Sequence, residues 1–335
     1  MGQGAGGKGI SCRFAFLIQI LKMSNTLVGV VIPLYMKADQ VLRSVRSVQA
    51  QTFTNWEMVV VDDGSSDDGA ERVRAVGDSR IRVHTQINQG VSAARNWGIQ
   101  LSTSDLIAFL DADDEWHPEF LETVVAMARS YPQAAWYATG YQIRHPREGV
   151  FDSRLRGVKS NFIRGLLPNY FLVAMQSDPP VWSSAVALRR AAIESIGGFP
   201  LGVDSGEDLL TWARLAVRYP LAYDVRPLAI FHVSGYDRHA DPKHLVSAAL
   251  TELVSAYPNT VGLRNYLGLW YRIQSVMAMR YDEAGLAQLC ARRAVWYGPR
   301  QWRNGYTLLL AWLPSTWRRC LDGALRRAAE IVKIN

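Results

Sequence analysis

The stretch Leu106–Pro118 reads as an apolar strand, an acidic turn and the start of a helix. Its carboxylates are Asp111, Asp113 and Asp114. Carboxylates crowded at the end of a strand repel one another and lose hydration, so we expect a cation between them. Mg²⁺ or Mn²⁺ fits, because one or two carboxylates hold such ions together with water and substrate phosphates. The alternative is a solvated acidic turn, with Asp113 or Asp114 favouring the positive N-terminus of the next helix.

Strand and helix patterns alternate from residue 27 onward. The expected strands are Val28–Leu34, Glu57–Val61, Ile81–His84 and the run ending at Asp111, and the expected helices include Val41–Val48 and Val91–Gln100. This alternation predicts an α/β fold with a doubly wound, mainly parallel sheet and right-handed crossovers. Ligands bind beyond the carboxyl ends of the strands in such sheets, where Tyr35, Asp63 and Asp111 emerge.

Two common phosphate-binding motifs are missing from the sequence. No Gly-x-Gly-x-x-Gly follows the first strand, which argues against an NAD-type Rossmann enzyme, and there is no P-loop lysine motif. The run Pro33–Met36 also lacks the Gly-rich, basic loop expected of a nucleotidyltransferase. A metal at Asp113 would supply the contact to phosphates instead.

Composition and charge restrict the class of protein. The chain has 335 residues and 49% hydrophobic content, enough for one large domain or two. Cys12, Cys290 and Cys320 lie far apart, which argues against a disulfide framework or a zinc site and favours a reducing cytoplasm. Of the net charge of +7, residues 300–335 carry +5, from seven basic and two acidic side chains. Such a tail suits either nucleic acid or an anionic membrane.

Six motifs in order resemble a known family. They are Val31-Ile32-Pro33-Leu34-Tyr35, Gln51-Thr52-Phe53, Val61-Asp62-Asp63-Gly64-Ser65, Asn88-Gln89-Gly90-Val91-Ser92-Ala93-Ala94-Arg95-Asn96, Asp111-Ala112-Asp113-Asp114 and Gly206-Glu207-Asp208. Over about residues 27–233 the chain resembles the inverting family 2 glycosyltransferases with the GT-A fold, of the bacterial polysaccharide and glycoconjugate type. The chain departs from the family at Met36, where an Asn is common, and this puts any contact of that Asn in doubt.

The resemblance implies a nucleotide site made of five residues. Pro33 and Tyr35 would line it, with Tyr35 stacked on the base, and Asp63 would accept a hydrogen bond from that base, usually uracil. Asp111 would lie near the ribose and Arg95 near the diphosphate. Each has a structural alternative, since Tyr35 could cap the sheet edge, Asp63 could begin a tight turn and Arg95 could be a surface residue.

The resemblance also implies the groups that carry the chemistry. Asp113 would ligate Mg²⁺ or Mn²⁺ at the diphosphate, and Asp208 would be the general base that takes the proton of the acceptor hydroxyl. Glu207 and Trp182 would line the sugar and acceptor pocket. Carboxylates are common in the first turn of a helix, and Trp182 could be a core residue. His232 could touch the metal or diphosphate, although a structural histidine satisfied within the fold is favoured.

Two function classes follow from this reading. The first is an enzyme that transfers a hexose or N-acetylhexosamine from a UDP-sugar to a glycan or lipid-linked acceptor with inversion. The second is a catalytically inactive nucleotide-sugar-binding or scaffold protein of the same fold. Asp63, Asp113 and Asp208 together favour the enzyme.

We expect three regions along the chain. Residues 1–25 would be a leader, disordered or a start-site extension; residues 26–238 would be the GT-A domain; residues 239–335 would be helical. Within the domain, Trp136–Pro180 shows little pattern and Val181–Leu188 reads as a strand. Further helices are expected at Ala191–Ile196, from Gly206 to Val217, and at Leu245–Tyr257, Leu263–Met279 and Ala284–Trp296.

The tail combines apolar and basic residues. An apolar cluster at 306–313 ends at Pro314, and a helix over 317–332 would place Trp317 and Leu321 on one face and Arg318 and Arg326 on the other. Such a helix suits an anionic membrane surface better than nucleic acid, which needs no apolar stripe. This would put the protein on the inner face of the cell membrane. The alternative is an amphipathic helix packed on its own domain or on a partner subunit.

Overall fold

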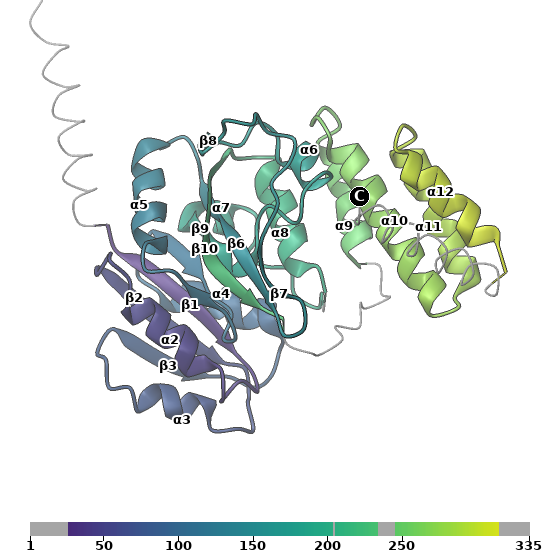
Figure 1. The fold of residues 1–335 in the computed structure, drawn as a ribbon. Helices are drawn as coiled ribbons and strands as arrows, with labels where there is room; N and C mark the ends of the chain where they lie inside the picture. The colour runs from purple at the N-terminus through teal and green to yellow at the C-terminus, as the bar shows by residue number, and fades with distance from the viewer. Residues whose placement is uncertain (1–25, 204, 234–244, 315–335) are drawn as a thin grey trace, which may run out of the picture. The chain divides into compact units, whose positions relative to one another are not determined.

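The chain forms two compact units, seen in a computed structural model that describes residues 26–203, 205–233 and 245–314 (Figure 1). Among these, the first unit comprises 26–168, 177–202 and 218–233. The second comprises 169–176, 203, 205–217 and 245–314. The expected leader at 1–25 and the tail helix at 317–332 lie outside the described residues.

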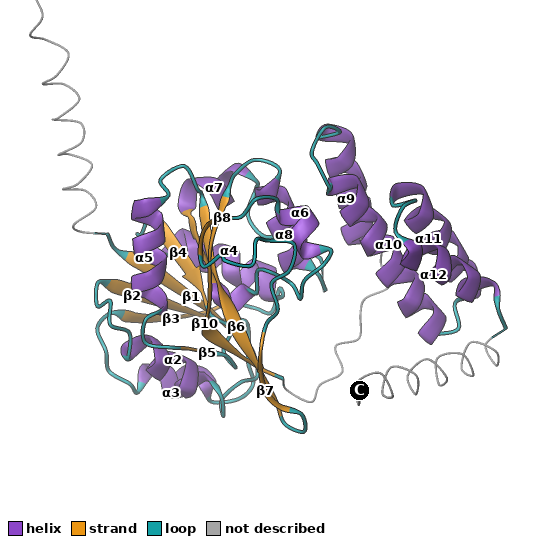
Figure 2. Ribbon diagram, turned by 45° about the horizontal axis from the view of Figure 1, so that its top comes forward, coloured by secondary structure: helices purple, strands orange, loops and turns teal. Residues whose placement is uncertain are grey.

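A mixed sheet forms the centre of the first unit. Its strands are β1 (Val28–Leu34), β2 (Trp56–Asp62), β3 (Ile81–Thr85), β4 (Leu106–Phe109), β5 (Glu115–Trp116), β6 (Trp136–His145), β7 (Gly149–Asp152), β8 (Arg164–Leu166), β9 (Val186–Arg189) and β10 (Leu221–His232). Figure 2 shows these strands gathered in the sheet. They are ordered β3-β2-β1-β4-β9-β6-β10-β5, with β7 beside β6 and β8 beside β10. Strands β3, β2, β1 and β4 run parallel, as do β6 and β10, while β9 is antiparallel to both neighbours. The predicted doubly wound, mainly parallel sheet is confirmed.

Both faces of the parallel strands are covered by helices. Those of the first unit are α2 (Val41–Gln49), α3 (Gly69–Arg74), α4 (Val91–Leu101), α5 (Phe120–Ser130) and α7 (Arg190–Ser195), with a 3₁₀ turn η1 at Ser183–Ala185. Because side chains alternate along a strand, Val30 and Ile32 pack in one core with α2 and α5, whereas Val59 and Val61 pack with Ala94 of α4. Strands β1, β2 and β4 therefore read as mostly apolar runs.

Two segments differ from what the sequence indicated. The region Trp136–Pro180, which shows little pattern in the sequence, begins with the ten-residue strand β6. Its first six residues are all buried, so no polar alternation marks it in the sequence. The expected strand Val181–Leu188 is wrong in its first half, where η1 precedes β9. This turn brings the hydroxyl of Ser184 to a carboxylate of the acidic turn.

Six helices belong to the second unit. They are α6 (Tyr170–Ala174), α8 (Glu207–Ala216), α9 (Leu245–Ala256), α10 (Leu263–Arg280), α11 (Ala284–Tyr297) and α12 (Trp302–Trp312). The three helices predicted from residue 245 to residue 296 are confirmed. Among the described helices, none is both long and apolar enough to cross a membrane.

Helices α6 and α8 group with the second unit, although the predicted boundary at residue 238 placed them in the first. Aromatic contacts explain this, since the rings of Tyr170 and Phe171 lie 6.2 and 5.4 Å from that of Tyr266 in α10. A Cβ on Gly206, just before α8, would come within 2.8 Å of the Trp270 ring. An apolar helix face looks the same in sequence whether a sheet or other helices cover it.

Close packing of α4 on β1 generates a prediction about stability. A Cβ on Gly98 would lie 2.3 Å from Cγ1 of Val31, in the core of the first unit. We expect Gly98→Ala to lower the free energy of unfolding by about 1–3 kcal/mol, the usual effect of overpacking. Thermal unfolding followed by circular dichroism measures this.

The matched control is Gly285→Ala in α11. A Cβ there meets nothing within 4 Å, so the change should stabilise the protein slightly through helix propensity. Equal effects of the two substitutions would contradict the close approach of α4 to β1.

Candidate active site

The acidic turn follows β4 at the carboxyl edge of the sheet, as predicted. Its backbone is closed by a hydrogen bond from Asp114 N–H to the Asp111 carbonyl, 3.0 Å long. The hydroxyl of Ser44 in α2 donates to the Asp114 carbonyl at 2.6 Å. The turn is thus tied to α2, and its three carboxylates point to different partners.

Asp111 is paired with a buried arginine. Nη2 of Arg95, in α4, donates to Oδ1 of Asp111 at 2.8 Å, and the Arg95 side chain is only 3% exposed. The surface alternative for Arg95 is therefore wrong. Its contact with a diphosphate stays a prediction. A charge this deeply buried needs its partner, because removing one member of a buried pair typically costs about 3–5 kcal/mol.

Asp113 is paired with a lysine that the sequence analysis did not single out. Nζ of Lys37, in the β1–α2 loop, lies 2.7 Å from Oδ2 of Asp113. Nη2 of Arg43 donates to the Asp113 carbonyl. The expectation of a cation among the carboxylates is met here by the protein's own side chains.

The acidic turn is compatible with a metal ion as well. Among the described residues, no three His, Cys, Asp or Glu side chains form a preassembled metal site. Mg²⁺, however, usually takes one or two carboxylates and completes its shell with water and phosphates. Asp111 and Asp113 are 18% and 16% exposed, and a carboxylate offers about four lone-pair sites. The donor set therefore fits a metal that arrives with a phosphate ligand.

Asp114 is the buried member of the turn. Its Oδ2 accepts hydrogen bonds from Ser184 Oγ at 2.5 Å and Trp182 Nε1 at 3.1 Å, and its Oδ1 accepts one from His232 N–H at 3.1 Å. Burial, reinforced by the charges of Asp111 and Asp113, raises the pKa of Asp114 to about 8. Asp114 is thus protonated at neutral pH, which removes one negative charge from the turn.

Trp182 and His232 have protein partners in the first unit. The Trp182 ring packs 4.2 Å from that of Phe231, in addition to its bond to Asp114. Nε2 of His232 lies 2.8 Å from Oε1 of Glu115. Burial lowers the pKa of His232, although Glu115 opposes this shift. These contacts favour the structural reading of His232, while a sugar contact of Trp182 stays a prediction.

Asp63 organises the loop between β3 and α4. Its Oδ1 accepts from Gln86 Nε2 at 2.7 Å and Gln89 N–H at 2.9 Å, and its Oδ2 accepts from Gly90 N–H at 2.8 Å. The carboxylate thus sits at the positive N-terminus of α4. Three of its about four lone-pair sites are used, so one remains for the predicted contact with a base.

Tyr35 and Pro33 differ in exposure. Tyr35 follows β1 and is 50% exposed, so its ring is accessible for stacking. Pro33 lies within β1 opposite Val61 and is half-buried. Asp63 N–H donates to the Leu34 carbonyl at 2.8 Å. Tyr35 and Asp63 therefore leave two adjacent strands at the same edge.

Glu207 and Asp208 belong to the second unit and are described within it. Both lie in the first turn of α8 and are half-buried. Oδ1 of Asp208 accepts from Leu209 N–H at 2.7 Å. Burial raises the pKa of Tyr266 to about 12, and the Asp208 charge adds to this shift. Tyr266 is therefore a protonated phenol in the electrostatic neighbourhood of Asp208.

Asn96 ties the loop at Phe199 to α4, a role that the sequence did not indicate. Its amide donates to the Phe199 carbonyl at 2.9 Å and accepts from Phe199 N–H at 2.7 Å. A Cβ on Gly198 would meet the Asn96 amide oxygen at 2.5 Å. The motif ending at Asn96 and the Gly-Gly-Phe run at 197–199 were both visible, but nothing in the sequence indicated that they pair.

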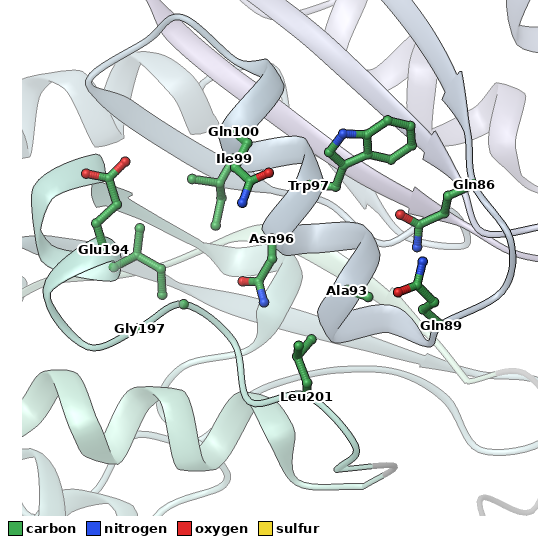
Figure 3. A pocket seen from close by; sticks show the side chains of 12 residues that line it. Gln86, Gln89, Ala93, Asn96, Trp97, Ile99, Gln100, Glu194, Gly197 and Leu201 are labelled. Carbon is green, nitrogen blue, oxygen red and sulfur yellow. The ribbon is translucent and has the colours of Figure 1, made fainter.

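A groove of about 770 Å³ runs along one side of α4 (Figure 3). Ala93, Trp97 and Gln100 line it from α4, and Leu201 lines it from the loop beyond Gly198. The predicted site residues are not among its lining residues. It is joined to the site through Gln86, which lines the groove and donates to Asp63.

The protonated state of Asp114 predicts a pH-dependent stability. The carboxyl has an ordinary pKa of 3.8 and a pKa of about 8 in the fold, so between these values the folded protein holds a proton that the unfolded chain releases. Stability must then fall as pH rises through this window, by at most about 1.4 kcal/mol per pH unit. We expect Asp114→Asn to remove this contribution. Urea unfolding between pH 5 and pH 8, with EDTA present, measures both profiles.

The control for this experiment is Asp39→Asn, an exposed surface carboxylate. It should keep the wild-type dependence on pH. Parallel profiles for the wild type and Asp114→Asn would contradict the raised pKa.

Comparisons with known proteins agree with this geometry. The profile of "Glycosyl transferase family 2" matches residues 29–197, half of the chain. An uncharacterised glycosyltransferase of Rickettsia felis is 29% identical over 226 residues, which cover 67% of this chain but only 36% of that protein. The Escherichia coli protein WfgD, a UDP-Glc:alpha-D-GlcNAc-diphosphoundecaprenol beta-1,3-glucosyltransferase, is 38% identical over 106 residues, 31% of this chain and 42% of WfgD.

Solved structures share the fold. S. aureus TarS 1–349, in complex with UDP-GlcNAc, aligns with a TM-score of 0.65 over 90% of this chain and 92% of TarS 1–349, at 15% identity. At this identity the likeness shows the fold alone, with its mostly parallel sheet. Together with the profile match over the strands that carry Tyr35, Asp63 and Asp113, it leads to one conclusion: the chain belongs to glycosyl transferase family 2 and has the GT-A fold.

Proposed function

We propose that the protein transfers a sugar from a UDP-sugar to a hydroxyl of a glycan or lipid-linked acceptor, with inversion at the anomeric carbon. The sugar would be a hexose or an N-acetylhexosamine. The observation that carries the proposal is the gathering of Tyr35, Asp63 and Asp113 beyond the carboxyl ends of β1, β2 and β4, respectively. These three strands are neighbours in the sheet. This edge is where ligands bind in open α/β sheets.

The nucleotide would be held by residues of the first unit. Tyr35, with its exposed ring, would stack on the base, and the remaining lone-pair site of Asp63 would accept a hydrogen bond from it. Asp111 would lie at the ribose with its orientation fixed by Arg95. UDP-GlcNAc in the complex with TarS and the UDP-glucose donor of WfgD support the choice of a UDP-sugar.

The diphosphate requires positive charge as its bond to the sugar breaks. We propose that Asp113, with Asp111 beside it, ligates Mg²⁺ or Mn²⁺ that neutralises the departing diphosphate. Lys37 would then leave Oδ2 of Asp113, and its ammonium, on a flexible side chain, would be available to the phosphate oxygens. Its 26% exposure leaves room for that movement.

The acceptor hydroxyl must lose its proton as it attacks the anomeric carbon. We propose that Asp208 takes this proton and that Glu207 and Trp182 contact the sugar or acceptor. Helix α8 supplies a rigid support, and the protonated phenol of Tyr266 does not compete as a base.

The names of two relatives support a lipid-linked or glycan acceptor. WfgD uses a diphosphoundecaprenol acceptor, as its name states, and WcaA of Escherichia coli is a putative glycosyl transferase of colanic acid biosynthesis, 34% identical over 122 residues. We propose an acceptor of this class, presented at the cytoplasmic face of a membrane. The predicted role of the tail at 317–332 lies outside the described residues and stays a prediction.

The metal assignment predicts the behaviour of Asp113→Asn. The variant keeps the shape of the side chain but loses the anionic ligand, so we expect it to fold normally and to lose both transfer and the enhancement of UDP binding by Mn²⁺. Titration calorimetry with UDP, with Mn²⁺ or with EDTA, measures the second effect without turnover. An equal UDP affinity of the wild type under the two conditions would contradict the metal role.

Lys37→Gln is the companion variant, because it removes the competing ammonium and leaves the Asp113 carboxylate intact. The ammonium lies 2.7 Å from Oδ2, on an oxygen that a divalent ion would use. We expect Mn²⁺ to bind Lys37→Gln up to about tenfold more tightly than the wild type in the absence of UDP. Weaker Mn²⁺ binding would show that Lys37 organises the site instead of competing for it.

The base assignment predicts that Asp208→Asn lowers kcat by about 10²–10⁴-fold. UDP-sugar affinity should stay nearly unchanged, because the carboxylate acts on the acceptor. Release of UDP from UDP-glucose and UDP-GlcNAc, with a panel of hydroxyl acceptors, measures turnover.

Glu207→Gln is the matched control one residue away in the same turn of α8. It should retain clearly more activity than Asp208→Asn if Asp208 is the base. The reverse order would move the role to Glu207, and UDP-sugar binding without any UDP release would favour the inactive binding protein.

A further inference from the structure

Helix α12 exposes three of its large apolar side chains and buries two of its polar ones. Trp302, Leu309 and Trp312 are 73%, 69% and 55% exposed, whereas Asn304 and Thr307 are buried. A helix that packs only on its own unit has the opposite arrangement, with its apolar stripe inward.

The buried polar residues have a structural reason. Nδ2 of Asn304 donates to the carbonyls of Ala294 and Gly298, each at 2.9 Å. These carbonyls lie at the C-terminal end of α11, and each also accepts one backbone N–H, from Gly298 and from Gln301 respectively. Thr307 Oγ1 donates to the Arg303 carbonyl within α12, at 2.8 Å. Packing of α12 on α11 thus explains the inner face but not the outer one.

The exposed residues form one continuous stripe. Trp302, Gly305, Leu309 and Trp312 are spaced by three, four and three residues, so they fall on one side of the helix. From Trp302 to Trp312 the stripe is roughly 15 Å long. We call these four residues the α12 stripe.

Positive charge surrounds the α12 stripe. The guanidinium of Arg303 lies 5.6 Å from the Trp302 ring and that of Arg292 lies 5.1 Å from the Trp312 ring. Residues 261–314 contain seven arginines and two acidic residues, which gives 7 − 2 = +5. Indoles flanked by arginines combine an apolar surface with cations at its edge.

We propose that the α12 stripe inserts into the interface of an anionic lipid bilayer. Tryptophan favours the level of the lipid headgroups, and arginines beside it meet the lipid phosphates. Nucleic acid would match the charge but not the apolar stripe. A protein partner would have to cover both indoles and also pair with the arginine beside each of them. Such a partner needs a surface with both apolar and acidic side chains. The proposal rests on described residues and depends neither on the tail nor on the sugar-transfer assignment.

The test uses the full-length chain and sedimentation with two kinds of vesicle. One kind contains phosphatidylcholine alone, and the other also contains phosphatidylglycerol, each at low and high salt. The stripe variant is Trp302→Ser/Leu309→Ser/Trp312→Ser. The matched control is Val150→Ser/Phe151→Ser/Ile163→Ser, which removes exposed apolar side chains of the first unit (54%, 41% and 67% exposed). A tail variant, Trp317→Ser/Leu321→Ser/Leu325→Ser, tests the other basic segment.

We expect salt-sensitive binding of the wild type and of the control to phosphatidylglycerol vesicles. The stripe variant should bind on the order of 100-fold more weakly, since three large apolar side chains are lost from the interface. The proposal is overturned if the stripe variant binds as the wild type does, whatever the tail variant does, or if the wild type does not bind. A wild-type dimer that the stripe variant converts to a monomer, with equal vesicle binding, would also overturn it in favour of a second copy of the chain.

A conservative variant keeps the test informative if the serine variant fails to fold. Trp302→Phe/Trp312→Phe retains the apolar stripe but removes its two indoles. Brominated lipids should quench tryptophan fluorescence of the bound wild type more strongly than that of this variant. Equal fractional quenching of the two proteins would place these indoles away from the lipid and overturn the proposal.

Discussion

Repulsion among three carboxylates in one short turn is the constraint around which the first unit is arranged. Two unit charges 4 Å apart interact by about 4 kcal/mol at the effective dielectric constant of a protein surface. The repulsion is relieved in three different ways. Asp111 pairs with the buried Arg95, Asp113 pairs with Lys37, and Asp114 is protonated. Arg95 belongs to α4, Lys37 to the β1–α2 loop, and the groups that bond Asp114 to η1 and β10, so the turn links these segments to β4.

This arrangement nearly balances the charges of the three carboxyl groups in the turn. Two carboxylates face two cations, while the third carboxyl is protonated at neutral pH. A diphosphate alone would bring excess negative charge, and a divalent ion alone would meet the ammonium of Lys37 at Oδ2 of Asp113. Under the proposed function, a metal ion and a diphosphate bound together would restore the balance. The resident ion pairs thus supply a physical reason for the two to bind cooperatively under the proposed function.

Much of the sheet and the outline of the site could be predicted from the sequence. Strands β1, β2 and β4 appear as mostly apolar runs, and the motifs at Asp63 and Asp113 follow β2 and β4. The counter-ions could not be predicted, because Lys37 lies 76 positions from Asp113 in the chain. Nor could the sequence separate Asp113 from Asp114. Neighbouring side chains in a turn diverge, and only packing by Ser184 and Trp182 decides which one is buried.

The surroundings of the predicted base, Asp208, could not be predicted from the sequence either. Helix α8 carries Asp208 in a motif typical of the transferase fold, yet its packing partners are helices of the second unit. Gly206, before the first turn of α8, is in a left-handed conformation, and a side chain there would collide with Trp270. Close approach of α10 thus shapes the start of α8, beside the carboxylate. Helix α10 therefore supports the turn that carries Asp208.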